Sequence, residues 1–260
     1  MTVPVVLIPG AWCSAASWQR VASILTPRGY DCVMPVLPAH EATADQPLRV
    51  RGLGLGDYLG ALEADLAARM FSMPPILIGH SLGALLAQQL AIKVQPLALV
   101  MLSPLAPAGI GSPAVRAAAL LPWLAAGLRG SAYKPSFGHA CRTLFNTVGA
   151  DRQRALHETL IHESARSAVQ LGFSAFTRWA VPKPGAVRCP VYIVSAGRDR
   201  FAPAAAAHAV ARAAPGAALR HYPERGHWLI DDEETEEMMH GICGWLRPLE
   251  QRAVKPLRGR

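Results

Sequence analysis

The stretch Pro75-Ile-Leu-Ile-Gly-His-Ser-Leu-Gly-Ala84 decides the fold. It begins with a short apolar run and ends in a Gly-x-Ser-x-Gly pentapeptide at residues 79–83. This pattern is typical of a buried strand that turns sharply into a helix, with the serine at the apex of the turn. The two glycines are needed because side chains there would collide with neighbouring backbone. We therefore predict a nucleophile elbow that exposes the Ser81 hydroxyl at the carboxyl edge of a sheet.

Short apolar runs alternate with helical stretches on both sides of this elbow. We expect strands at residues 3–8, 31–34, 75–78, 97–102, 191–194 and 219–222, and helices at residues 17–28, 81–93, 203–214 and 235–246. A further helix is expected from Asp57 as its N-cap, with Tyr58, Leu62 and Leu66 on one face, after a Pro- and Gly-rich loop at 35–56. Repeated alternation predicts the α/β class, with a mostly parallel sheet of about six strands flanked by helices.

One interval, between Pro104 and Pro184, breaks this alternation. It contains no convincing strand, only helical stretches interrupted by glycine and proline. An excursion of that length between two adjacent strands must leave the sheet and pack on top of it. We therefore predict a helical lid inserted at residues 104–184, a core made of residues 1–103 and 185–250, and a basic C-terminal tail at 251–260.

Two further residues complete a catalytic triad with the serine. A serine hydroxyl is a weak nucleophile at neutral pH and needs a base, and the base needs a carboxylate to orient it. Asp199 follows the strand expected at 191–194, and His227 follows the last expected strand, inside Gly226-His-Trp228. Both fall at the same sheet edge as Ser81, in the chain order serine, acid, histidine. We predict that Asp199 and His227 are the acid and the base.

Other titratable residues near these motifs have structural interpretations. His80 adjoins the nucleophile but is expected to point away from it, and His40 is expected to pack a loop. Asp231 and Asp232 begin an acidic stretch at the start of the last helix, where negative charge favours the helix dipole.

These motifs give the chain a resemblance to the α/β-hydrolase superfamily over almost its whole length. The residues that carry it are Gly79–Gly83, Gly197–Asp199 with Pro203, Gly226–His227 and Leu37–His40. Residues Pro9–Trp18 resemble the His-Gly-Ala-Trp loop of the esterase and hydroxynitrile-lyase branch, although Pro9 stands where relatives usually carry histidine and Ala39-His-Glu41 replaces Gly-His-Gly.

The resemblance also implies the groups that would surround a reacting carbonyl. The backbone N–H groups of Ala11 and Leu82 would form the oxyanion hole, which a side-chain change at position 9 does not remove. Trp12, Cys13 and Trp228 are candidate pocket residues, with packing an equal alternative for Cys13.

Composition excludes several other function classes. The net charge is +8 and the pI is near 9.7, but apart from the tail the basic residues are scattered and accompany no nucleic-acid-binding module. The five cysteines have neither disulfide-framework nor metal-ligand spacing, so reduced thiols in a cytoplasmic protein, bacterial by its Arg- and Ala-rich composition, are expected. The apolar run at 3–8 is too short to span a membrane.

The predicted function is two-step acyl transfer to water, without metal or organic cofactor. The expected substrate is a small to medium hydrophobic ester, thioester or lactone, and the protein is expected to be a monomer or homodimer. Two alternatives remain: another reaction on the same triad, such as C–C bond hydrolysis, lyase or perhydrolase chemistry, and a ligand receptor or inactive relative. Hydroxynitrile lyases rely on an added lid lysine, and the lid lysines here are Lys134 and Lys183.

Overall fold

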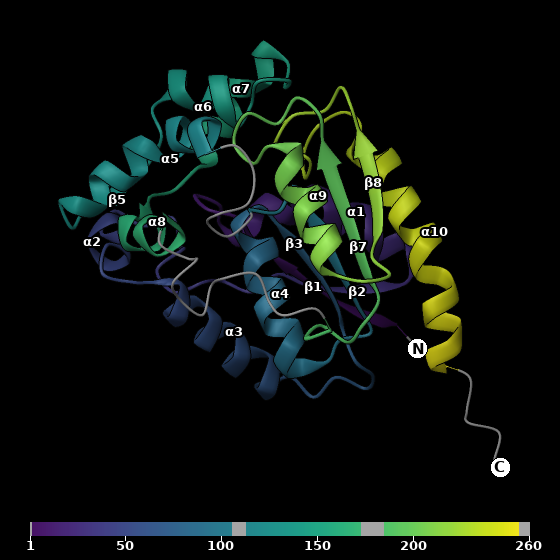
Figure 1. The fold of residues 1–260 in the computed structure, drawn as a ribbon. Helices are drawn as coiled ribbons and strands as arrows, with labels where there is room; N and C mark the ends of the chain where they lie inside the picture. The colour runs from purple at the N-terminus through teal and green to yellow at the C-terminus, as the bar shows by residue number, and fades with distance from the viewer. Residues whose placement is uncertain (1, 106–112, 173–184, 255–260) are drawn as a thin grey trace.

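The centre of the molecule is a six-stranded parallel sheet. The computed structural model describes residues 2–105, 113–172 and 185–254 (Figure 1). The strand order is β2-β1-β3-β4-β7-β8, and each neighbouring pair is parallel. The strands are β1 (Val3–Ile8), β2 (Tyr30–Val33), β3 (Ile76–His80), β4 (Ala98–Leu102), β7 (Val191–Ala196) and β8 (Ala218–Tyr222). The predicted fold class is therefore confirmed.

Helices cover both faces of this sheet. They are α1 (Gln19–Leu25), flanked by 3₁₀ turns at Ala15–Trp18 and Thr26–Arg28, α3 (Leu55–Ala68), α4 (Leu82–Val94), α9 (Ala204–Ala213) and α10 (Thr235–Val254). Helices α3 and α4 pack together with α4 against β3, whereas α1 packs against α10 on the other face (Figure 1). Strands β3 and β4 are buried along their whole length, which explains why their sequences are uninterrupted apolar runs.

Two expectations in the connection before β3 need correction. Asp57 is the third residue of α3 and not its N-cap, which is Gly54; the Asp57 carboxylate accepts a hydrogen bond from the Gly54 N–H at 2.7 Å. A carboxylate in the first turn stabilises the helix start from either position, so the residue type alone did not fix the register. The loop expected at 35–56 also contains a short helix, α2 (Gln46–Val50), which is too short to show a helical period.

The chain between β4 and β7 is mostly helical, as expected. Its described part, residues 113–172, is called the insertion below. Its elements are α5 (Pro113–Leu128), β5 (Ala132–Tyr133), α6 (Phe137–Thr143), α7 (Ala150–Thr159), β6 (Glu163–Ser164) and α8 (Ala165–Gly172). Strands β5 and β6 form an antiparallel pair, which corrects the expectation that no strand occurs here. Two residues are too few to show alternation. The remaining residues of the expected lid, 106–112 and 173–184, lie outside the described ranges.

The last helix is longer than predicted. It continues from Thr235 to Val254 with Pro248 inside it, instead of ending near Leu246. The first four residues of the expected basic tail are thus helical, and residues 255–260 lie outside the described ranges. No helix in the described part of the chain combines the length and the apolar character that a membrane span needs.

Candidate active site

Ser81 occupies the turn between β3 and α4 in a strained backbone conformation. Its φ is 56° and its ψ is −118°, in a region that non-glycine residues rarely adopt. The strain persists because the neighbours fix the turn: the Ser81 N–H donates to the carbonyl oxygen of Leu102 at 2.9 Å, and the Ser81 carbonyl accepts from the Ala84 N–H at 3.1 Å. Residues 79–83 therefore adopt the turn that the sequence pattern predicts.

The two elbow glycines are required by close approach and not by unusual φ angles. An ideal Cβ on Gly79 would overlap the carbonyl group of Gly83 and lie 2.7 Å from the Cα of Ala84. An ideal Cβ on Gly83 would overlap the carbonyl of Ile8 and lie 2.5 Å from that of Pro9. Both overlaps are with backbone, which cannot rotate away.

Ser81, His227 and Asp199 form a continuous chain of hydrogen bonds. His227 Nε2 lies 2.9 Å from Ser81 Oγ, and His227 Nδ1 lies 2.8 Å from Asp199 Oδ2. Because an ionised carboxylate only accepts, Nδ1 carries the proton and Nε2 is free to accept from the serine. All three residues are buried, with exposures of 3%, 1% and 7%. This arrangement can move a proton from the serine to the imidazole and stabilise the resulting charge.

Backbone donors hold the second oxygen of Asp199. Its Oδ1 accepts from the N–H groups of Phe201 and Ala202, at 2.8 and 2.7 Å. With one oxygen bound in this way, the other faces His227 in a fixed orientation. Asp199 thus follows β7 in a turn whose backbone N–H groups bind one oxygen of its carboxylate.

His80 forms a hydrogen bond with the backbone of His227. Its Nε2 donates to the carbonyl oxygen of His227 at 2.8 Å. Burial, followed by the nearby His227, lowers the pKa of His80 to about 3, so its ring stays neutral. His80 therefore contacts the His227 backbone and not the reacting atoms.

The loop after β1 passes close to the elbow. An ideal Cβ on Gly10 would lie 3.0 Å from the carbonyl oxygen of His80 and 3.2 Å from the Cβ of Ser81, so a glycine allows this approach. In the described part of the chain, the N–H groups of Ala11 and Leu82 donate to no recorded acceptor. Leu82 is the first residue of α4, where N–H groups have no partner within the helix. Both donors are available to a bound oxyanion.

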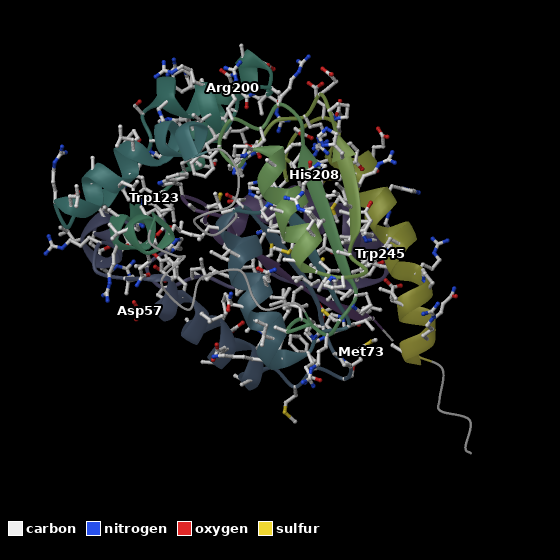
Figure 2. The ribbon with its side chains drawn as sticks, in the orientation of Figure 1. Asp57, Met73, Trp123, Arg200, His208 and Trp245 are labelled. Carbon is white, nitrogen blue, oxygen red and sulfur yellow. The ribbon has the colours of Figure 1, made fainter. Side chains whose placement is uncertain are left out.

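Trp12 connects this loop to the insertion. Its φ is 62°, its indole N–H donates to the carbonyl of Tyr133 at 2.9 Å, and its carbonyl accepts from the Ile161 N–H at 2.9 Å. Its ring packs 4.7 Å from that of Trp123, which Figure 2 labels in the insertion. The loop is thus tied to the insertion.

The three candidate pocket residues are all buried in this structure. Trp12 and Trp228 are each 3% exposed and Cys13 is 1% exposed. Trp228 packs edge-on against Phe145, with ring centroids 4.9 Å apart. Burial raises the pKa of the Cys13 thiol to about 12, so it remains protonated. These residues pack the site, and their contact with a substrate remains a prediction.

A buried polar network joins the sheet domain to the insertion, and its central residue could not be predicted from the sequence. Glu163 is fully buried and accepts from Tyr58 Oη at 2.5 Å, His40 Nε2 at 3.2 Å and the Ser164 N–H at 2.6 Å. Burial alone would lower the pKa of His40, but the Glu163 carboxylate outweighs it and raises that pKa. His40, expected to pack a loop, is therefore an ionic partner of the insertion.

Within residues 2–105, 113–172 and 185–254, no group of three or more His, Cys, Asp or Glu residues could hold a metal ion. The Lys134 ammonium group donates to the carbonyl of Leu160 at 2.5 Å, inside the insertion. Lys183 lies outside the described residues.

Comparison with known proteins bears on the family and the fold. The sequence model of a family described as "Alpha/beta hydrolase family" matches residues 5–239. No curated protein sequence matches the chain significantly.

Similar solved structures cover nearly the whole chain at low identity. A methylesterase from Arabidopsis is 14% identical, with a TM-score of 0.70, over 94% of this chain and 99% of that chain. An extracellular alpha/beta-hydrolase from a Paenibacillus species is 16% identical, with a TM-score of 0.69, over 98% and 100%. A pyrethroid hydrolase from Sphingobium faniae is 21% identical, with a TM-score of 0.70, over 94% and 98%. At these identities the similarity shows the fold alone.

Proposed function

The chain belongs to the alpha/beta hydrolase family, and from this premise we propose that it is a serine hydrolase that cleaves an ester-type bond through an acyl-enzyme. One observation carries the proposal: the unbroken hydrogen-bonded chain from Ser81 through His227 to Asp199, with the serine on a strained turn. That constellation is recognised by geometry and roles.

In the proposed first step, Ser81 Oγ attacks the substrate carbonyl carbon while its proton passes to His227 Nε2. Asp199 stabilises the imidazolium through Nδ1. The bond to the leaving group then breaks, and the leaving oxygen or sulfur takes the proton from Nε2. A water molecule attacks the acyl-enzyme, gives a proton to His227, and the acid leaves as Ser81 recovers that proton.

The N–H groups of Ala11 and Leu82 are proposed to bind the oxyanion of both tetrahedral intermediates. Their lack of another acceptor among the described residues supports this role. A donor of this kind contributes about 3 kcal/mol to transition-state stabilisation.

We propose that the insertion acts as a lid and that the substrate is a small to medium hydrophobic ester, thioester or lactone. The burial of Ser81 and His227 and the aromatic surroundings of Trp12 support an apolar, enclosed site. The methylesterase and the pyrethroid hydrolase of similar fold are hydrolases by name. Five free cysteines support a cytoplasmic location.

Lyase chemistry on the same triad has less support. It would need a lysine directed at the substrate, whereas the Lys134 ammonium group is bound to a carbonyl oxygen within the insertion. No contact of the described residues favours a receptor, and the experiment below separates it from an enzyme.

The test is intact-mass analysis after treatment with a fluorophosphonate, beside turnover of nitrophenyl esters of increasing acyl length. Wild type is expected to take one adduct, and Ser81→Ala none, with turnover reduced about 10⁴-fold or more. Ser103→Ala is the matched control, because Ser103 is also buried beside the elbow and its hydroxyl has no partner among the described residues. It should label as wild type does. A wild type without adduct or turnover would point to a receptor or inactive relative.

A further inference from the structure

Two adjacent residues of the insertion contact both of the loops that carry the acid and the histidine. Asn146 and Thr147 lie between α6 and α7. Asn146 Nδ2 donates to the carbonyl oxygen of Arg198 at 2.9 Å, one residue before Asp199. Thr147 Oγ1 accepts from the Gly226 N–H at 3.0 Å, one residue before His227. The insertion thus contacts the backbone immediately beside each proposed catalytic residue.

These contacts close a ring, because the two loops also bond to each other. The Arg198 N–H donates to the carbonyl oxygen of Arg225 at 2.9 Å. The ring passes from Asn146 to Arg198, from Arg198 to Arg225, along the chain to Gly226, and through Thr147 back to Asn146. Displacing any member therefore changes the separation of the two loops.

The insertion approaches Gly226 so closely that a side chain there would force Thr147 and Asn146 to move. An ideal Cβ there would lie 2.5 Å from Thr147 Oγ1 and 2.9 Å from Asn146 Oδ1. Gly226 is not among the residues with positive φ, so close approach and not backbone conformation explains it. The glycine of the Gly226-His227 motif is therefore a contact surface for the insertion.

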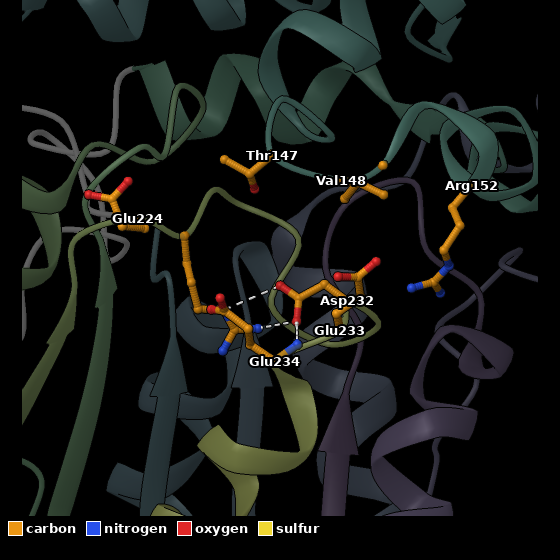
Figure 3. Close-up of a pocket in the computed structure, with 9 residues that line it drawn as sticks. Thr147, Val148, Arg152, Glu224, Asp232, Glu233 and Glu234 are labelled. Carbon is orange, nitrogen blue, oxygen red and sulfur yellow. Dashed lines mark hydrogen bonds and ion pairs between the residues drawn. The ribbon is translucent and has the colours of Figure 1, made fainter.

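Beyond Thr147 a cavity lies between the two parts of the molecule, and Arg152 of α7 spans them by donating to Asp231 Oδ1 at 2.8 Å. The cavity has a volume of about 250 Å³ and is lined by Thr147, Val148 and Arg152 of the insertion and by Asp232, Glu233 and Glu234 of the core. Figure 3 shows Thr147 and Val148 on one side of it and the carboxylates of Asp232 and Glu233 on the other. Besides the Arg152–Asp231 ion pair, the Phe145–Trp228 ring contact and the hydrogen bonds of Asn146 and Thr147 hold the insertion against the histidine loop.

The other side of the histidine loop is anchored to the start of α10. Arg225 Nη2 donates to Asp232 Oδ1 at 2.5 Å and to the Leu229 carbonyl at 3.2 Å, and Nε donates to Asp232 Oδ2 at 3.2 Å. The loop is thus held from the core on one side and from the insertion on the other.

We propose that Asn146 and Thr147 are positioning residues that align His227 and Asp199 with Ser81. The inference rests on the proposed function, since alignment affects rate only if the triad acts. The elbow fixes Ser81 by its own backbone contacts, so losing the ring displaces the base relative to a stationary nucleophile.

The test compares Thr147→Val, which removes the acceptor at nearly constant volume, with Thr147→Ser, which keeps it. Thr143→Val is the matched control, because the Thr143 hydroxyl bonds only within α6, to the His139 carbonyl at 2.7 Å. Thr147→Val is expected to lower kcat about tenfold with KM unchanged, and the double variant with Asn146→Ala about 100-fold, as for small misplacements of catalytic groups. Thr147→Ser should restore kcat.

Two measurements do not depend on turnover: hydrogen exchange of the Gly226 amide, and the NMR resonance of the His227 Nδ1 proton. Faster exchange and a changed resonance in Thr147→Val, but not in Thr143→Val, support positioning even if wild type hydrolyses no ester. Equal kcat, exchange and resonance in those two variants would overturn it. Thermal unfolding of each variant shows that the fold is retained.

Discussion

The elbow and the insertion hold the proposed triad by different means. In the elbow, Gly79 and Gly83 leave no room for a side chain because neighbouring backbone atoms occupy it, and these contacts fix Ser81. In the insertion, side chains far along the sequence reach the loops of Asp199 and His227 through single hydrogen bonds. The nucleophile is thus fixed by steric exclusion, whereas the acid and base are fixed by a few polar contacts.

Two of the places where the insertion joins the sheet domain are unlike. Around Glu163 the contact is fully buried, and its carboxylate binds three donors. Around Thr147 the contact is exposed and borders a cavity. A buried, unpaired charge is far more costly than an exposed one. The first junction should therefore determine stability, whereas the second should determine the alignment of His227 and Asp199.

The largest effect is expected from Gly83→Ala. The new Cβ would overlap the carbonyl of Ile8, and backbone must move to admit it. We expect a loss of about 4 kcal/mol or more in the free energy of unfolding, measured by urea denaturation. Gly60→Ala is the control, since no atom lies within 4 Å of a Cβ there and Gly60 is inside α3. It should be neutral or stabilise by up to about 1 kcal/mol. If Gly83→Ala were as stable as Gly60→Ala, steric exclusion by backbone would not be what fixes Ser81.

Glu163→Gln should have the next largest effect. It leaves His40 buried without its ionic partner, at a cost of about 3 kcal/mol in the free energy of unfolding. Glu158→Gln, an exposed carboxylate in the same insertion, is the control and should change stability by less than about 0.5 kcal/mol. If Glu163→Gln matched that control, the buried junction would not be the stabilising one.

The same junction predicts a pH dependence. The folded pKa of His40 is raised by Glu163 despite burial. A histidine with a raised folded pKa adds stability that is fully present below its unfolded pKa, about 6.5, and is lost as the pH rises through the folded value. The stability difference between wild type and His40→Gln should therefore shrink as the pH rises above about 6.5, by at most about 1.4 kcal/mol per pH unit. Denaturation between pH 6 and 9 measures it, and a constant difference would contradict the ionic pairing.

The elements whose signal is local could be predicted from the sequence. Apolar runs gave the six strands, and the elbow glycines with the chain order of acid and histidine brought Ser81, Asp199 and His227 together in space. The N-cap at Asp57 was wrong by three residues, because an acid suits several positions of a first turn.

The junctions could not be predicted because their partners are remote in sequence. Glu163 meets Tyr58 105 residues away and His40 123 residues away. A single glutamate in a two-residue strand, or a single asparagine between two helices, carries no sign of a distant partner. The aromatic residues Phe173, Phe176 and Trp179 of the expected lid lie outside the described residues.

The smallest effect is expected from Gly226→Ala, which tests the contrast between glycines most sharply. Its Cβ would also come too close to two atoms, but these are Thr147 Oγ1 and Asn146 Oδ1, the ends of side chains that can rotate. The stability loss should be about 1 kcal/mol, whereas kcat should fall severalfold because rotation of Thr147 breaks its bond to the Gly226 N–H. The double variant Gly226→Ala/Thr147→Ala relieves the overlap with Thr147 without restoring that bond, so most of the lost stability should return while kcat remains low. Recovery of both in urea denaturation and ester turnover would mean that space alone, and not the hydrogen bond, links the insertion to His227.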